Sequence, residues 1–287
     1  MKTLVTGGNG LVGSALKQLN KDWLYVDRRT CDLTNRQDTL ALFKTVQPDR
    51  LVHLAAYVPG FYKIDKVDSF AVNVRINENV LEAANVSNVN RAIFCLSVNM
   101  FPDNPLHYPM DEKMIMEGSV SGPFAGYAYS KRMLELQCQN YNSQYNRQYF
   151  GIIPCNIYGK NDNLDSGRLI PNLTKQFKKA IQDNTSVTIN GSGKPLRQFV
   201  YADDLAKIIP ILLDTYHKTE PLICCGNEEV SIAELAHLIG KVLNFENEIA
   251  FDTTKPDGVL KKTVKGSYID NMFQFTPLEE GLKQVLL

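Results

Sequence analysis

The sequence lacks both an excess of charge of one sign and a long uninterrupted apolar run. Lys plus Arg and Asp plus Glu each number 31, so the formal net charge is zero. A balanced chain has no basic excess to attract nucleic acid or an anionic membrane. The N-terminal stretch MKTLVTGGNGLVGSALK is apolar, but glycines interrupt it, so it predicts neither a signal peptide nor a membrane span. We therefore expect no nucleic-acid partner and no membrane partner.

Metal-binding patterns are also lacking. The six cysteines include no C-x-x-C pair, and none of the four histidines stands at metal-ligand spacing from them. The sequence therefore predicts no metal site. In a chain of 287 residues, such cysteines are expected to be buried, reduced thiols of a cytoplasmic protein. They are Cys31, Cys95, Cys138, Cys155, Cys224 and Cys225.

Short β-branched segments alternate with helical patterns up to about Gly159. TLVT is followed by LVGSALKQL, and RLVHLAA by a long stretch that ends in NENVLEAANV. Strands that alternate with helices indicate βαβ units. The fold class predicted is therefore α/β, with a doubly wound parallel sheet of the Rossmann type.

The alternation becomes irregular beyond Gly159. Helical patterns occur near 169–181, 203–215 and 232–243, and the segment 251–263 reads as loop and extended chain. We expect a smaller α/β substrate-binding lobe there. The predicted division is a dinucleotide-binding domain over 1–160, which also receives roughly 187–217, and a lobe made mainly of 161–287.

A glycine-rich turn follows the first predicted strand. Gly7, Gly10 and Gly13 form G-x-x-G-x-x-G, with Leu11 and Val12 opening a helix. Glycines let the backbone approach a pyrophosphate, and a helix N-terminus supplies N–H groups and a favourable dipole. An ordinary tight turn is the alternative. The strand before and the helix after this turn favour dinucleotide binding.

Asp27, Arg28 and Arg29 end the second predicted strand, twenty residues after the first glycine. A lone acidic residue at this place favours the ribose hydroxyls of NAD. Two arginines immediately after it suit a 2′-phosphate, because the guanidinium fork matches phosphate geometry. A solvated charged turn is the alternative. We expect the cofactor to be NADPH/NADP.

Tyr127 and Lys131 form Y-x-x-x-K in a helical pattern, so their side chains share one helix face. A lysine ammonium and a positively charged nicotinamide are expected to lower the tyrosine pKa from about 10. Tyr127 would then deliver the proton that a ketone oxygen needs during hydride transfer. Ser97, at the end of the fourth predicted strand, would hydrogen-bond that oxygen. These three residues are the predicted catalytic group.

Together these motifs resemble the extended short-chain dehydrogenase/reductases, and in particular the GDP-L-fucose synthase family. The resemblance runs nearly end to end and includes LVTGGNGLVGSA, NGSGKPLRQFVYADDLA and FDTTKPDGVLKKT. It implies an NADPH-dependent enzyme that acts on a GDP-4-keto-6-deoxy sugar, and we expect a homodimer. The cofactor contacts it implies are Asp32, Leu33, Leu54, Ala55, Ala56 and Pro154. The substrate contacts it implies are Asn156, Lys175, Arg197 and Lys262.

Three positions depart from that family. Its members invert C3 and C5 with a Cys and a His, where this chain has Asn99 and Arg168. An amide does not titrate usefully, and a guanidinium stays protonated above pH 12, so neither side chain can exchange those protons. Asn190 stands where the family commonly has Trp. We expect all three residues to contact the substrate in a changed sugar site.

The main hypothesis is a 4-ketoreductase of a GDP-activated 4-keto-6-deoxy sugar without 3,5-epimerase activity. One alternative is a bifunctional GDP-L-fucose synthase whose acid–base groups have moved. Cys155 and His107 are the candidates for such a pair, although packing or loop structure explains both more simply. Another alternative is a non-catalytic nucleotide-binding regulatory subunit, which would have no chemical need for Ser97, Tyr127 and Lys131.

Overall fold

A six-stranded parallel sheet forms the centre of the larger part of the molecule. The computed structural model describes residues 1–58, 65–160, 162–266 and 268–287. The strand order is β10-β5-β4-β3-β1-β2, and every pairing is parallel. The strands are β1 (Thr3–Thr6), β2 (Leu24–Val26), β3 (Arg50–His53), β4 (Arg91–Cys95), β5 (Gln148–Pro154) and β10 (Leu222–Cys224).

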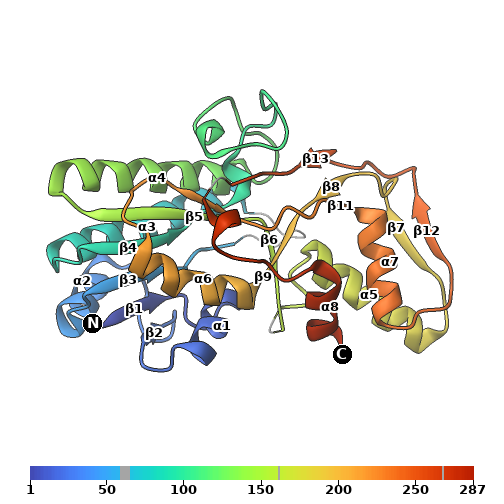
Figure 1. Ribbon diagram of the computed structural model, residues 1–287, viewed down its shortest axis with the longest axis horizontal. Coiled ribbons are helices and arrows are strands. Elements are labelled where there is room, and N and C mark those ends of the chain that lie inside the picture. The colour runs from blue at the N-terminus through green and yellow to red at the C-terminus, as the bar shows by residue number, and fades with distance from the viewer. Residues whose placement is uncertain (59–64, 161, 267) are drawn as a thin grey trace.

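Helices cover both faces of this sheet (Figure 1). One face carries α1 (Leu11–Leu19) and α6 (Ala202–Thr215), and the other carries α2 (Arg36–Val46), α3 (Lys66–Val86) and α4 (Ala125–Tyr145). Successive strand side chains point to opposite faces, so neighbours such as Leu4 and Val5 enter different cores. The sheet is therefore covered on both sides, which is why the residues of its strands are mostly apolar.

The smaller lobe has its own apolar core, built around Phe177 and Leu235. Its helices are α5 (Leu169–Asp183), α7 (Ile232–Val242) and α8 (Leu278–Leu286). Its two-stranded sheet joins β7 (Val187–Asn190) to β12 (Ile249–Asp252). Figure 1 shows these elements beyond the carboxyl ends of the large sheet, with the C-terminus among them.

Two small sheets lie between the large sheet and this lobe (Figure 1). One consists of β11 (Val230–Ser231), β8 (Leu196–Arg197) and β13 (Lys261–Lys262), and the other of β6 (Asn156–Tyr158) and β9 (Phe199–Tyr201). Short 3₁₀ turns are η1 (Val98–Met100), η2 (Glu112–Met114) and η3 (Ile269–Asn271). Segments far apart in sequence thus meet next to the ends of β4 and β5.

The predicted fold class is confirmed: the sheet is parallel, doubly wound and flanked by helices. The division into two domains stays a prediction, and the packing differs from it in two places. Of the segment 187–217, α6 packs on the large sheet but β7 pairs with β12. The strand β10, which lies beyond that segment, completes the large sheet beside β5. Among the described residues, no helix combines the length and apolarity needed to cross a membrane.

Candidate active site

A cleft of about 990 Å³ lies at the carboxyl ends of the sheet strands. Strand order reverses between β1 and β3, and ligands of open α/β sheets bind at such switch points. Fifteen of the sixteen residues expected at the cofactor line this cleft: Gly7, Gly10, Leu11, Val12, Gly13, Asp27, Arg28, Asp32, Leu33, Leu54, Ala55, Ala56, Tyr127, Lys131 and Pro154. Their individual roles stay predictions.

The glycine-rich turn has no room for side chains at two of its positions. A Cβ on Gly7 would lie 2.8 Å from the Ala55 nitrogen, and the backbone there has φ +75°. A Cβ on Gly13 would lie 2.3 Å from the Gly7 oxygen. Helix α1 begins directly after Gly10, and its first-turn N–H groups have no intrahelical acceptor. The turn therefore offers a bare backbone cradle that fits a pyrophosphate.

Asp27 organises the turn after β2. Its Oδ1 accepts from the N–H groups of Arg29 and Thr30 at 2.9 and 3.1 Å, and its Oδ2 accepts from Asn9. These backbone hydrogen bonds lower the pKa of the Asp27 carboxyl. Arg28 lines the cleft, but Arg29 is not among the described lining residues. The carboxylate thus shapes the turn from which Arg28 lines the cleft.

Ser97, Tyr127 and Lys131 also line the cleft. Lys131 is 2% exposed, and its Nζ donates to the Cys95 carbonyl at 2.6 Å and lies 5.7 Å from the centre of the Tyr127 ring. Ser97 follows β4 by two residues and caps η1, where its Oγ accepts from the Asn99 N–H at 3.2 Å. The structure therefore brings the predicted catalytic group together.

Tyr127 is 8% exposed, and burial raises the pKa of its phenol. A hydrogen bond with Ser97 and the charge of Arg168 lower that pKa, but not enough to offset burial. The predicted net lowering of the Tyr127 pKa is wrong for the protein's own groups, because burial outweighs the groups that lower it. A raised pKa keeps Tyr127 protonated at neutral pH, which suits a proton donor.

The substrate residues implied by the resemblance divide into separate groups. Arg168 lines the same cleft as Tyr127. Lys262 and Arg197 are register partners on β13 and β8, and the Lys262 Nζ donates to the Asn99 Oδ1 at 3.4 Å. Burial lowers the pKa of the Lys262 ammonium to about 8. Lys262 thus contacts the side chain of Asn99, two residues after Ser97.

The described lining of the cleft includes none of the other six predicted substrate residues, which are Asn99, Asn156, Lys175, Asn190, Arg197 and Lys262. Asn156 is exposed and its Nδ2 donates to the Gln198 carbonyl at 2.8 Å. Lys175 is paired with Asp165 at 2.5 Å, and Asp165 itself lines the cleft. Asn190 is exposed at the end of β7, opposite Asp252 of β12. Their predicted substrate contacts stay predictions.

The histidine considered as a relocated acid–base group is held in a surface loop. The His107 side chain is 55% exposed, lies 3.8 Å from the Asp111 carboxylate and contacts the Pro109 carbonyl at 3.0 Å. It is not among the described residues that line the cleft. His53, by contrast, is a core residue, and burial lowers its pKa to about 3.

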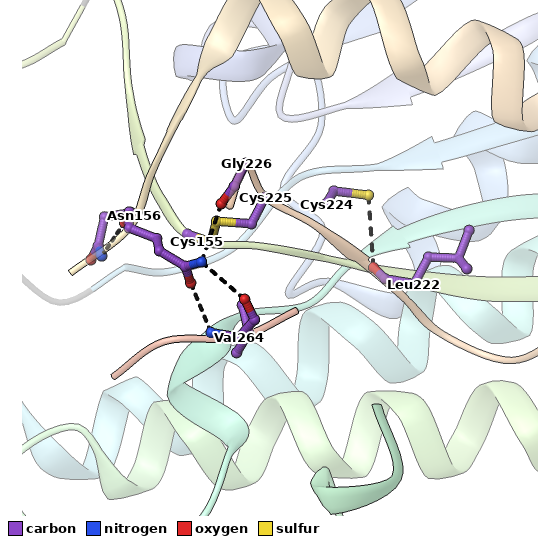
Figure 2. The surroundings of a disulfide bond; sticks show 8 residues. Cys155, Asn156, Leu222, Cys224, Cys225, Gly226 and Val264 are labelled. Carbon is purple, nitrogen blue, oxygen red and sulfur yellow. Dashed lines mark hydrogen bonds between the residues drawn. A yellow bond between two sulfur atoms is a disulfide. The ribbon is translucent and has the colours of Figure 1, made fainter. Parts of the chain in front are cut away.

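Cys155 and Cys225 form a disulfide, so the expectation of six reduced thiols is wrong for these two. Strands β5 and β10 end side by side, with Pro154 opposite Cys224. The residues that follow them, Cys155 and Cys225, are therefore close neighbours, with Cα atoms 5.6 Å apart. Figure 2 shows the bond that joins Cys155 to Cys225. The other four cysteines are free thiols. Cys155 also lines the cleft, where it carries no titrating thiol.

Reduction of this bond should lower the free energy of unfolding by about 2 to 4 kcal/mol, because the crosslink restricts a long loop of the unfolded chain. We expect guanidinium denaturation to show this loss when dithiothreitol is added to the wild-type protein. The Cys225→Ser variant should show the same loss without reductant and no further loss with it. Peptide mapping under non-reducing conditions that finds both thiols free would contradict the pairing.

Several lining residues had no signal in the sequence. Asn163, Asp165 and Ser166 line the cleft from the loop before α5, and Arg75 lines it from α3. They belong to no motif with a fixed spacing, although the stretch NDN after IYGK lies in a part of the chain that resembles the family. Among the described residues, no group of three or more His, Cys, Asp or Glu side chains could hold a metal ion.

Comparison with known proteins identifies the family. Residues 3–226 match the model of the NAD dependent epimerase/dehydratase family. The GDP-L-fucose synthase of Dictyostelium discoideum is 39% identical over 98% of this chain and 92% of that protein. The GDP-L-fucose synthase of Sinorhizobium fredii is 31% identical over 97% of this chain and 92% of that protein.

A solved structure agrees with these relatives. The GDP-L-fucose synthetase of Naegleria fowleri bound to NADP superposes with a TM-score of 0.91 and 33% identity, covering 99% of this chain and 92% of that one. The resemblance seen in the sequence is thereby confirmed. With its bare glycine cradle and its buried tyrosine–lysine pair in one cleft, the chain belongs to the GDP-L-fucose synthase family of the extended short-chain dehydrogenase/reductases.

Proposed function

We propose that the protein is an NADPH-dependent 4-ketoreductase of a GDP-activated 4-keto-6-deoxy sugar, which reduces C4 without inverting C3 or C5. The observation that carries this proposal is the cleft itself. It joins the glycine cradle and Arg28 to Ser97, Tyr127 and Lys131. Location in the cytoplasm and assembly as a homodimer remain predictions.

Each catalytic residue has one role in the reduction. Bound NADPH would supply the hydride that the carbonyl carbon accepts. Ser97 would hydrogen-bond the ketone oxygen as charge develops, and Tyr127 would donate its phenolic proton to that oxygen. Lys131, fixed by the Cys95 carbonyl, would keep a positive charge near the phenolate that remains.

The contacts of four side chains argue against an epimerase step. Inversion needs a base that removes a proton from the carbon beside the ketone and an acid that returns one from the other face. Asn99 accepts a hydrogen bond from Lys262, and Arg168 is paired with the Asp162 carboxylate. Cys155 is bonded to Cys225, and His107 lies in a surface loop. None of these four can serve as the exchangeable acid–base pair in this arrangement.

Solvent exchange tests this proposal. Epimerisation passes through a carbanion or enediolate, so in D₂O it leaves deuterium at the inverted carbon. Incubation with GDP-4-keto-6-deoxy-mannose and NADPH in D₂O should therefore give a product with no deuterium at C3 or C5, as read by NMR. The substrate incubated without protein gives the background. Deuterium above that background would establish a bifunctional enzyme instead.

A restored pair provides the matched positive control. The double variant Asn99→Cys, Arg168→His should gain deuterium at C3 or C5, because Lys262 would stabilise a thiolate at position 99. This comparison is read from deuterium incorporation alone, because the variant also replaces the Arg168 guanidinium. Absence of any NADPH oxidation by the wild-type protein would favour the regulatory-subunit alternative.

A further inference from the structure

A buried carboxylate pairs with a guanidinium at the substrate end of the cleft. The Arg168 Nη2 donates to the Asp162 Oδ1. The Asp162 side chain is 6% exposed, whereas the Arg168 side chain is 31% exposed and lines the cleft. The carboxylate therefore stands behind the guanidinium, and the guanidinium is the group that a ligand in the cleft can reach.

The protein also fixes this guanidinium at a second point. The Arg168 Nη1 donates to the Ile157 carbonyl at 3.1 Å. The Arg168 N–H donates to the Ser166 Oγ at 3.3 Å, and its carbonyl accepts from the Asn172 N–H at 2.9 Å where α5 begins. The backbone and the guanidinium of Arg168 are thus both held. A guanidinium has five N–H donors, so donors remain that make no hydrogen bond with the described residues.

The charge of Arg168 acts on the catalytic tyrosine. Both side chains line the same cleft, and the guanidinium is one of the groups that lower the pKa of the Tyr127 phenol. Burial of Asp162 raises its carboxyl pKa, and the neighbouring Arg168 opposes this rise. An Arg without its buried carboxylate would keep its charge but lose the contact that directs it.

We propose that Asp162 is a positioning residue for the ketone reduction: its carboxylate holds the Arg168 guanidinium in the cleft, where the guanidinium stabilises negative charge on the ketone oxygen and on Tyr127. This inference rests on the proposed reductase function. It gives Arg168 an electrostatic role in place of the acid–base role that the family assigns to His at this position.

The charge balance of the step shows where the guanidinium acts. As hydride reaches C4, a C–H bond forms and the electron pair of the C=O π bond moves to oxygen. That oxygen takes the phenolic proton, so the O–H bond of Tyr127 breaks and a phenolate remains until water returns a proton. A fixed cation in the same cleft as Tyr127 would stabilise each stage without reorganising.

A double-mutant cycle tests the proposal. The four proteins are wild type, Asp162→Asn, Arg168→Met and the double variant, assayed for NADPH oxidation with GDP-4-keto-6-deoxy-mannose. We expect kcat to fall about 100-fold in Arg168→Met, by the scale of a lost oxyanion contact, and about 10-fold in Asp162→Asn. If Asp162 acts through Arg168, the double variant should equal Arg168→Met within about twofold.

Thermal unfolding and NADPH affinity, measured on all four proteins, separate positioning from general damage. Asp183→Asn removes the Lys179 ion pair from the far end of α5 and should leave kcat unchanged. If the fold losses in kcat of the two single variants multiply in the double variant, or if kcat is unchanged in Asp162→Asn, the positioning role is overturned. Either result leaves the reductase function intact. No turnover by the wild-type protein would reject the function, and with it the inference.

Discussion

The Tyr127→Phe variant should lose at least about 100-fold in kcat, because it removes the only atom that donates a proton in the proposed reduction. The phenol is 8% exposed and hydrogen-bonds with Ser97, and its replacement removes the group that transfers a proton to the ketone oxygen. NADPH affinity should change by less than about twofold, since the glycine cradle and Arg28 are untouched. Steady-state NADPH oxidation and fluorescence titration measure the two quantities.

Tyr145→Phe is the matched control, because this tyrosine is on the same helix α4 and is exposed. Its kcat should equal that of the wild-type protein. Because burial raises the pKa of the Tyr127 phenol, the wild-type donor should also remain protonated between pH 6 and pH 9. Tyr127→Phe with an unchanged kcat would remove the tyrosine from the mechanism and favour the non-catalytic alternative.

The parts of the site that the sequence predicts are those defined by short spacings. Gly7 and Gly13 flank one turn, and Tyr127 and Lys131 are one helical turn apart, so local geometry alone places each pair. Ser97 could be placed because the carboxyl ends of parallel strands meet at one edge of the sheet. The fold class could be predicted because the alternation of strands and helices is also a local pattern of the sequence.

What the sequence does not show depends on contacts between distant segments. Cys155 and Cys225 are 70 residues apart and meet only because β5 and β10 are neighbours in register. The strand β10 is three residues long, so its place in the sheet has no strong local pattern. Lys262 reaches Asn99 across 163 residues by way of the β8–β13 pairing. Each contact follows from topology, which spacing alone cannot supply.

The paired variant Arg28→Ala, Arg29→Ala should bind NADPH about 100-fold more weakly and NADH within about threefold of the wild-type protein. Only the 2′-phosphate loses its partners, and a charge-assisted hydrogen bond contributes roughly 1.5 to 3 kcal/mol. The single variant Arg28→Ala should account for most of the loss, because Arg28 lines the cleft and Arg29 is not among the described lining residues.

Arg36→Ala is the control, since this arginine pairs with Glu82 on the surface. Equal losses of the two cofactors, measured by titration at one fixed salt concentration, would place the 2′-phosphate site elsewhere, because the two cofactors differ only in that group.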